Sequence, residues 1–471
     1  MSRESEPNHL PPGTSPGLRR VALSLSRPVE KFLHIQASSG IVLMLVALIA
    51  MAWANSPWAS SYEHFLHAPI KVGVGDFVFD RSVHFWVNDI LMVVFFFVVG
   101  LEIRRELHQG ELAELRRAAL PIAAALGGML VPAGLYFALT SGQVEARDGW
   151  SVPMATDIAF AVGVFALLGK RVPAALRVLL LALAIIDDIG AILVIALFYT
   201  SELLHGGFAL AGGGIVLVLL MQRVGIRNPF LYIVPGVLLW AGILWSGIHP
   251  TVAGVIMGLL TPAVPWFSRE GFVETSERAL ENVRCATRDN IPLEKMKTDL
   301  EIINLAQREA IAPVTRIETA LHPWVAFGIM PLFALANAGV PLGDINFDAA
   351  GASGVAIGIT LGLVLGKPLG ILLFSWLAVR SGLATLPRGV TWPGVFVVGT
   401  TAGIGFTMAL FIGALAFPDP GLLAVSKGSV LAASLIAGVI SMVAGLKLLP
   451  REQAPDTRDI TPGQAESSTE V

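Results

Sequence analysis

The sequence predicts an all-α integral membrane protein with twelve transmembrane helices. Of its 471 residues, 54% are hydrophobic and 14% charged, and the mean hydropathy is +0.71. Apolar segments also recur along most of the chain, and many approach the roughly 20 residues that a helix needs to cross a bilayer. In lipid such segments form helices because every backbone polar group must be paired. The net charge of −3 offers no basic face for nucleic acid, and the single cysteine, Cys285, excludes an internal disulfide.

Polar tails flank the apolar region. Residues 1–31 contain a proline-rich tail and the start of an interfacial helix, which we expect over residues 21–36 on the inner membrane surface. We interpret the first twenty residues as disordered and not as a cleavable signal. The transmembrane domain then covers residues 32–449, and residues 450–471 form a flexible tail.

The apolar segments divide the central domain. They cover residues 38–55, 83–103, 118–140, 150–169, 174–199, 207–222, 229–246, 248–266, 321–341, 352–378, 391–416 and 422–448. The polar interval 265–319 interrupts them, and its mixed charges predict a helical insertion on the cytoplasmic side, which we interpret as solvated.

Basic residues indicate the orientation. Those that follow even-numbered segments are Arg104, Arg105, Arg116, Arg117, Lys170, Arg171, Arg223, Arg227, Arg380 and Arg388. The opposite loops carry chiefly Lys71, Arg81 and Arg147. Because cytoplasmic loops are enriched in Lys and Arg, both termini are predicted to be cytoplasmic.

An outer loop shows a strand-like pattern. Residues 71–80 (KVGVGDFVFD) alternate apolar and polar side chains around Gly75 and Asp76, which is typical of a two-residue hairpin. An exposed hairpin can pair with the same hairpin of a second chain, so we predict a homodimer. The alternative is that residues 71–80 form an ordinary surface loop.

The most informative polar residues are two neighbouring acids, Asp187 and Asp188, inside the apolar run 178–198. Each ionisable group at the bilayer centre costs roughly 2.5–3.5 kcal/mol, and two adjacent carboxylates oppose each other's ionisation. The pair is therefore suited to exchanging protons for a cation.

Two segments carry signs of a break. The fourth contains Thr156 and Asp157 in PMATDIAFAVG, and the eleventh contains the glycine-rich TTAGIGFTMALFIG. With an offset of 246 residues, Ile158, Phe160 and Phe165 match Ile404, Phe406 and Phe411. This match predicts inverted repeats in which two broken helices cross at the midplane.

Broken helices leave partial charges of about half a unit at their ends. We expect Asp157 to face two positive ends. Lys367, in GLVLGKPLGILLF, either faces two negative ends or pairs with an aspartate. Because unpaired buried charges are costly, these groups must pair or meet water.

Together these motifs resemble the NhaA-type sodium/proton antiporter family. The resemblance runs from about Phe32 to Leu449 and rests on VNDILMVVFFFVVGLEIRRE, MATDIAFAVGVFALLG, LALAIIDDIGAILVIALFYT, SGIHPTVAGVIMG, LHPWVAFGIMPLFALANAG, GKPLGI and GIGFTMALFI. It implies a multi-pass protein of the bacterial inner membrane. It also implies secondary transport, with no enzymatic reaction and no cofactor.

The resemblance also assigns site residues. It places Na+ (or Li+) and protons at Asp187 and Asp188, with Asp188 the direct ligand and Asp187 paired with Lys367. Asp157 and Thr156 would lie at the crossing and help to bind the ion, and Lys367 would compensate charge or carry a proton. Carboxylate and hydroxyl oxygens suit hard cations. For Thr156, a hydroxyl bonded to its own helix is the alternative.

A pH response is implied for the acids at the cytoplasmic funnel, Glu102, Glu106 and Glu318, although solvated acids at helix ends are the simpler interpretation. Thr319 stands where some family members carry histidine. His249 titrates near neutrality and is the other candidate for the pH response, or it caps the eighth segment.

The predicted mechanism is competition between protons and one cation for a shared site. The resemblance implies that two protons are exchanged per cation and that net charge moves, with Asp188 releasing one proton and either Asp187 or Lys367 the other. A proton-coupled symporter of an organic solute is the main alternative. An aspartyl protease would need a GxGD element within a span, whereas the run GVGD at residues 73–76 lies in the predicted outer hairpin. A retinal pump with Lys367 as its Schiff base normally needs seven spans.

Overall fold

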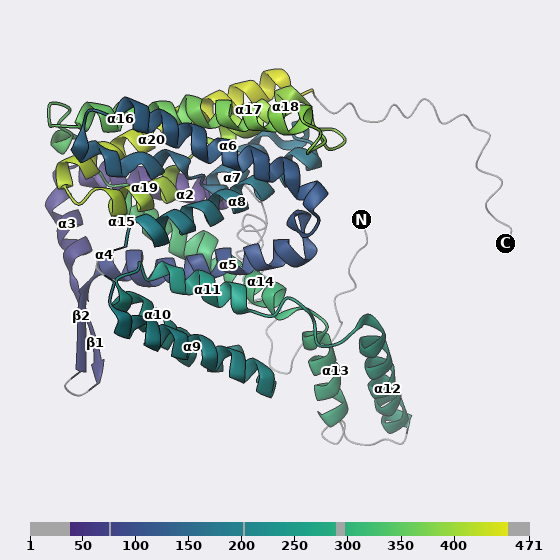
Figure 1. Cartoon of the computed structure of the whole chain (residues 1–471). Coiled ribbons are helices and arrows are strands. Elements are labelled where there is room, and N and C mark those ends of the chain that lie inside the picture. The colour runs from purple at the N-terminus through teal and green to yellow at the C-terminus, as the bar shows by residue number, and fades with distance from the viewer. Residues whose placement is uncertain (1–37, 75–76, 201–202, 289–296, 451–471) are drawn as a thin grey trace, which may run out of the picture.

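The computed structural model describes residues 38–74, 77–200, 203–288 and 297–450. These residues are almost entirely helical, and most helices lie side by side along one direction (Figure 1). The predicted N-terminal tail 1–31, the interfacial helix 21–36 and residues 451–471 of the predicted C-terminal tail lie outside the described residues.

The first described elements form a helical corner and a hairpin. Helix α2 (Ser38–Ala54) meets α3 (Ala59–His67) at an angle of 113°. Strands β1 (Pro69–Val74) and β2 (Phe77–Ser82) then pair antiparallel, with Val74 opposite Phe77. The predicted hairpin is therefore confirmed, while its turn residues, 75 and 76, lie outside the described residues.

The next helices supply the first half of the membrane region. They are α4 (Val83–Phe85), the π-helical turn η1 (Trp86–Leu91), α5 (Met92–Gln109), η2 (Glu111–Ala113), α6 (Leu115–Leu139), η3 (Val144–Met154), α7 (Ile158–Leu168), η4 (Gly169–Arg171) and α8 (Ala174–Phe198). The helices α9 (His205–Val224), η5 (Pro229–Tyr232), α10 (Ile233–Ser246) and α11 (Thr251–Leu260) follow.

The second half follows the polar insertion. Its helices are α14 (Pro313–Trp324), η7 (Val325–Ile329), α15 (Met330–Asn337), η8 (Leu342–Asp344), α16 (Ala352–Leu361), η9 (Gly362–Gly366), α17 (Lys367–Arg380), α18 (Trp392–Ala402), α19 (Phe406–Ala416) and α20 (Pro420–Leu448).

Each of the twelve predicted segments coincides with a helix, a helix continued through a π-helical turn, or a bent helix pair. Within the described residues, eight helices are long and apolar enough to cross a membrane, or up to eleven when each bent pair counts as one span. The helix Thr251–Leu260 is apolar but shorter.

Two boundaries differ clearly from the prediction. The eighth segment was expected to reach residue 266, whereas α11 ends at Leu260. The ninth segment was expected at 321–341, whereas α14 begins at Pro313, so residues 313–319 belong to a spanning helix and not to the insertion. A proline at the first helical position has its φ already set for the helix. Apolarity alone missed this extension because polar side chains line its first turns.

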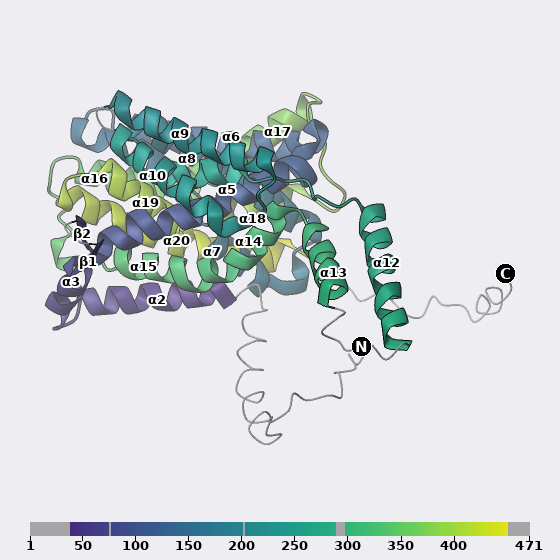
Figure 2. The same ribbon diagram turned by 90° about the horizontal axis from the view of Figure 1, so that it is seen from below.

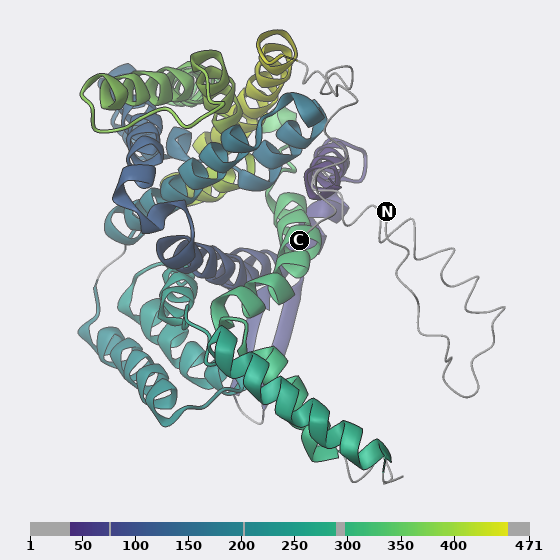
Figure 3. The ribbon, with the colours of Figure 1, turned by 90° about the vertical axis from the view of Figure 1, so that its right-hand side faces the viewer.

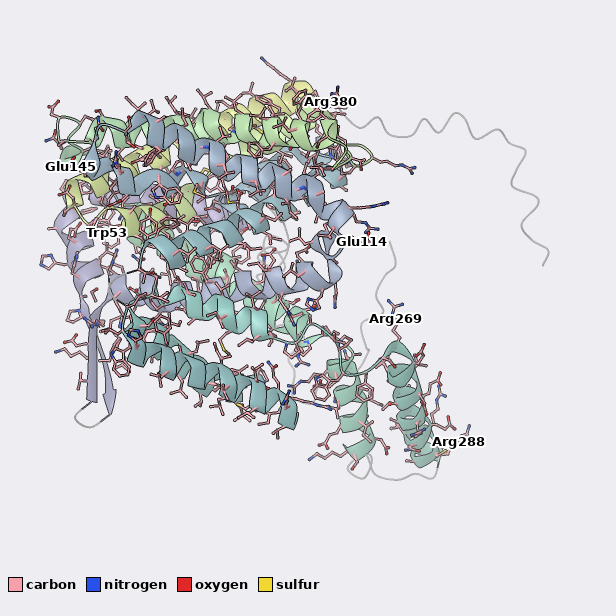
Figure 4. The ribbon with its side chains drawn as sticks, in the orientation of Figure 1. Trp53, Glu114, Glu145, Arg269, Arg288 and Arg380 are labelled. Carbon is pink, nitrogen blue, oxygen red and sulfur yellow. The ribbon has the colours of Figure 1, made fainter. Side chains whose placement is uncertain are left out.

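The insertion is helical, as predicted, and its described residues form a pair of helices. Helices α12 (Arg269–Arg288) and α13 (Lys297–Glu309) pack together, and Asn282 donates a hydrogen bond of 2.9 Å to Asp299 between them. They stand beyond one end of the membrane helices (Figures 1 and 2). Arg380 and Glu114 lie at this same end, whereas Trp53 and Glu145 lie at the other (Figure 4).

Glycines bring several helices into backbone contact. Gly127 of α6 faces Gly370 of α17, and Gly100 of α5 faces Gly258 of α11, so that a Cβ at any of the four would press on the partner's backbone. In a membrane the hydrophobic effect does not drive helices together, so association depends on the close packing that small residues permit. Helices α16–α18 and α9–α10 lie on opposite sides of the molecule (Figures 1 and 3).

The two predicted breaks are present and touch each other. The helix pairs η3/α7 and α18/α19 bend by 46° and 48°. Between them, the Asp157 amide donates to the Ile404 carbonyl at 2.8 Å, and the Phe160 and Phe406 rings lie 5.3 Å apart. The breaks therefore meet inside the protein, while the inverted symmetry of the two halves stays a prediction.

Candidate functional site

Asp187 lies midway along α8 in a buried ion pair. Its Oδ2 is 3.0 Å from Lys367 Nζ, and both side chains are 0% exposed. The Thr156 hydroxyl donates to the same oxygen at 2.7 Å. Lys367 begins α17 directly after the π-helical turn η9, and such turns often occur at functional sites.

Asp188 is buried beside this pair but is not held by it. The residue is 2% exposed, and among the described residues no donor makes a hydrogen bond to its carboxylate. Asp187, Asp157 and Glu102 are negative groups within electrostatic reach, and Lys367 is the opposing positive group. Adjacent helical residues point about 100° apart, which explains why the two aspartates have different surroundings. The Asp188 oxygens thus keep their lone pairs for a ligand.

Asp157 caps two helix N-termini at once. Its Oδ1 accepts from the Phe160 amide of α7 at 3.0 Å, and its Oδ2 accepts from the Thr407 amide of α19 at 3.0 Å. The Thr407 hydroxyl donates to Oδ2 as well. Each N-terminus carries a partial positive charge, so one carboxylate neutralises two helix ends. This is the position that the sequence predicted for Asp157.

The two negative ends have different partners. Lys367 Nζ donates to the Met154 carbonyl at the end of η3. The Ala402 carbonyl at the end of α18 accepts from the Thr156 hydroxyl at 3.1 Å. The prediction that Lys367 faces two negative ends is right for one of them, and its alternative, a direct pair with an aspartate, holds as well.

Thr156 is not bonded to its own helix, so that alternative is wrong. It lies in the extended break, where its hydroxyl reaches Asp187 and Ala402. A hydroxyl has one hydrogen, which these two acceptors must share. Thr156 therefore couples the ion pair on α8 to the end of α18.

Sequence reasoning missed Thr407 and Ser434. Ser434 of α20 accepts a hydrogen bond of 3.0 Å from the Phe406 amide at the start of α19. The signal for Thr407 was available in GIGFTMALFI, where a hydroxyl follows the glycine break by two residues. Its partner Asp157 is 250 residues away, so only the packed structure identifies the contact.

The three acids proposed for a pH response gather around one arginine. Arg105 forms an ion pair with Glu318, lies 3.3 Å from Glu106, and approaches Glu102 at 4.0 Å. Glu318 is buried, and its Oε2 has no hydrogen-bond partner. The sequence listed the acids but missed Arg105 as their shared counter-ion.

His249 lies apart from that cluster. Its Nδ1 is 2.8 Å from the Thr251 hydroxyl and 3.5 Å from the Thr251 amide, which agrees with the predicted cap of the eighth segment. Its Nε2 faces Asp89 at 3.8 Å. Asp89 precedes Arg105 by sixteen residues along a helix, a distance of about 24 Å.

Broken helices that meet inside a helical bundle, with buried charges at their ends, are typical of secondary transporters. Comparison with known sequences gives the family. The sequence model of the family described as Na+/H+ antiporter 1 matches residues 30–444, and the chain belongs to this family. The NhaA-type resemblance is thereby confirmed.

Individual relatives belong to the same family of antiporters by name. The chain is 56% identical to the Na(+)/H(+) antiporter NhaA 2 of Sorangium cellulosum, over 99% of each chain, and 54% identical to the Na(+)/H(+) antiporter NhaA 2 of Myxococcus xanthus, over 100% of this chain and 99% of the relative. Among solved structures, the sodium proton antiporter MjNhaP1 from Methanocaldococcus jannaschii matches with a TM-score of 0.44 and 15% identity, over 92% of this chain and 98% of that chain. The family assignment rests on the sequence matches alone.

Proposed function

We propose that this protein exchanges cytoplasmic Na+, or Li+, for external H+. The observation that carries the proposal is the contrast between two adjacent buried carboxylates. Asp187 is neutralised by Lys367 and Thr156, whereas Asp188 has no hydrogen-bond donor among the described residues. Relatives along the whole chain are named Na(+)/H(+) antiporters, and nothing in these matches supports the alternative of solute symport.

Competition follows from the charge at this site. A buried carboxylate without a counter-ion is costly, so Asp188 holds either a proton or a cation. In the proposed cycle Asp188 is the direct ligand, and Thr156 and Asp187 supply further oxygens. A cation that draws Asp187 away from Lys367 leaves the ammonium group buried and favours loss of its proton. Two protons would then leave per cation, and transport would be electrogenic.

The proposed topology has twelve spans related by inverted repeats, both termini in the cytoplasm, and a location in the bacterial inner membrane. It rests on the twelve helical segments and on the basic residues at the α12–α13 end. In this arrangement the touching breaks hold the site near the midplane, so that rocking of one bundle against the other exposes it to either side.

Asp188→Asn tests the cation site. In inverted vesicles carrying a quenched pH-sensitive dye, sodium or lithium should restore fluorescence with the native chain and fail to do so with the variant, because an amide has no negative charge and no titratable proton. Asp348→Asn, which changes an exposed carboxylate, is the control and should behave as the native chain. Sodium-driven proton release that persists in Asp188→Asn would contradict the assignment.

We also propose that the Arg105 cluster sets the pH response, with His249 as a second candidate. Glu318→Gln should move the activity profile to lower pH, because the variant lacks the negative charge of Glu318 that opposes ionisation of Glu102. Glu114→Gln, at an exposed acid paired with Arg117 at 3.1 Å, should leave the profile unchanged. If the pH dependence of transport were the same in Glu318→Gln as in the native chain, the Arg105 cluster would not set the pH response.

A homodimer through the β1–β2 hairpin is the remaining proposal. The hairpin exposes Ile70, Val72 and Val78, and a two-stranded sheet has unpaired edges. Replacing Val72 with Lys should shift the detergent-solubilised protein towards monomer, as measured by mass. An unchanged mass would favour the surface-loop alternative.

A further inference from the structure

The π-helical turn η1, which precedes α5, is joined to the end of α15 by a pair of side-chain amides. Asn337 Nδ2 donates to Asn88 Oδ1 at 2.8 Å, and Asn88 Nδ2 donates back to Asn337 Oδ1 at 3.3 Å. Asn88 lies in the π-helical turn η1, which continues into α5. This reciprocal pair ties two helices that lie 249 residues apart in the sequence.

The orientation of both amides is determined by the backbone. Asn337 Nδ2 also donates to the Phe333 carbonyl at 3.1 Å. If the Asn337 amide were reversed, its oxygen would face that carbonyl, and two acceptors would meet. The Phe333 carbonyl therefore orients Asn337, and Asn337 in turn orients Asn88.

The chain of hydrogen bonds ends at a histidine. His84 Nε2 is 3.1 Å from Asn88 Nδ2. Because that nitrogen of Asn88 carries only hydrogens to donate, His84 Nε2 must accept, and the ring is neutral with its proton on Nδ1. A protonated ring would place an N–H against an NH2 group. Reversing Asn88 to relieve this contact would break both bonds to Asn337.

Other charged groups surround this histidine. Lys427 of α20 and His67 of α3 lie within electrostatic reach of His84, and Glu63 lies within reach of Lys427. On the neighbouring strand, the Arg81 guanidinium lies 5.3 Å from the Phe85 ring. Asp89, in the same turn as Asn88, faces His249. None of these groups supplies an acceptor within hydrogen-bonding distance of His84 Nε2 among the described residues. The Asn337 side chain does lie within hydrogen-bonding reach of the ring, but its oxygen already accepts from Asn88, so a protonated ring would compete with Asn88 for it.

We propose that His84 is a proton-operated latch on the outer side, where protonation of its ring opens the Asn88–Asn337 amide pair and slows cation exchange. His84 is half-buried in α4, and this helix lies at the end of the molecule that carries the β1–β2 hairpin (Figure 1). Helix α5, which the latch anchors, also carries Glu102, within electrostatic reach of Asp188. The effect on exchange rests on the proposed antiport function and orientation.

Right-side-out vesicles with a buffered interior test the latch. External acid increases the proton gradient that drives sodium efflux, so a slower efflux in acid is a distinctive result. We expect efflux from the native chain to fall about threefold as external pH is lowered from about 6.5 to about 4, because the Asn88 bond to the neutral ring and the nearby Lys427 oppose protonation of His84. His84→Gln should lose this fall and match the native rate at the higher pH. His64→Gln, at an exposed histidine of α3, should retain it.

A second variant tests the hydrogen bond between Asn88 and His84 directly. Asn88→Asp offers a carboxylate oxygen to the protonated His84 ring, so the slowing should occur at higher external pH. In histidine-labelled protein, the imidazole resonance absent from His84→Gln should titrate at higher pH in Asn88→Asp than in the native chain. An unchanged titration, or equal effects of His84→Gln and His64→Gln on efflux, would overturn the latch. If no variant and no native protein moved sodium at any pH, the antiport proposal would fail while this titration still decided the latch.

Discussion

The buried site around Asp187 and the α12–α13 insertion contain ion pairs of nearly equal length in opposite surroundings. In the insertion, Arg278 and Glu274 lie 2.8 Å apart, with side chains 73% and 72% exposed. At the site, Lys367 and Asp187 lie 3.0 Å apart, with both side chains 0% exposed. An exposed pair contributes about 0–1 kcal/mol, whereas removing one partner of a buried pair costs about 3–5 kcal/mol. The surroundings, and not the distance, decide what each pair contributes.

The largest expected effect comes from breaking the buried pair. Lys367→Met leaves the Asp187 carboxylate buried and uncompensated, so we expect a loss of about 3–5 kcal/mol in the free energy of unfolding and a clear fall in Tm. Thermal unfolding in detergent measures this. Lys297→Met, on the exposed face of α13, should change Tm little. Adding Asp187→Asn to Lys367→Met should restore much of the loss, and a double variant no more stable than the single would argue against a charge effect.

A smaller loss is expected at the double cap. Thr407→Val removes the hydroxyl that donates to Asp157 but leaves the Thr407 amide bond in place. Loss of one hydrogen bond to a buried charged group should cost about 1–3 kcal/mol, measured by the same unfolding assay. Thr287→Val, whose hydroxyl bonds its own helix on exposed α12, is the matched control. Equal losses of unfolding free energy in the two variants would mean that the hydroxyl bond to Asp157 stabilises the protein no more than an exposed hydroxyl bond does.

The link between the breaks should have a moderate effect on transport. Thr156→Val removes the bonds to Asp187 and Ala402, whereas Thr156→Ser keeps a hydroxyl. We expect the valine variant to raise the KM for sodium by up to about tenfold, which corresponds to about 1.4 kcal/mol, and the serine variant to stay near the native value. A valine variant with native KM would show that this hydroxyl positions neither Asp187 nor the ion.

The smallest effect belongs to the insertion. Arg278→Ala should change the free energy of unfolding by no more than about 0.5 kcal/mol and should leave exchange unchanged, because water screens this pair. A larger loss of stability, measured by thermal unfolding, would mean that the pair supports more than the solvated surface of α12.

The candidate site could be predicted only in part. Asp187, Asp188, Asp157 and Lys367 were found from sequence because each interrupts an apolar run, and burial in lipid makes such interruptions costly. The role of Thr407 at Asp157, and that of Arg105 as a counter-ion of the acids, were missed because hydroxyls and arginines near helix ends are common. Their partners, Asp157 and Glu318, are 250 and 213 residues away, and no local pattern links them.

The sequence by itself determined that the chain is a helical membrane protein, where most of its helices lie, and that a few ionisable groups must share its interior. Hydropathy and the cost of unpaired backbone and charge in lipid suffice for that. Only the tertiary structure decided which partner each group has. Asp157 serves two helix ends, and Thr156 bridges to Ala402. Of the four site residues Asp157, Asp187, Asp188 and Lys367, only Asp188 has neither a hydrogen-bond donor nor an ion-pair partner within the described residues. These pairings arise from the way two broken helices meet, and contacts between distant segments depend on packing that no single segment encodes.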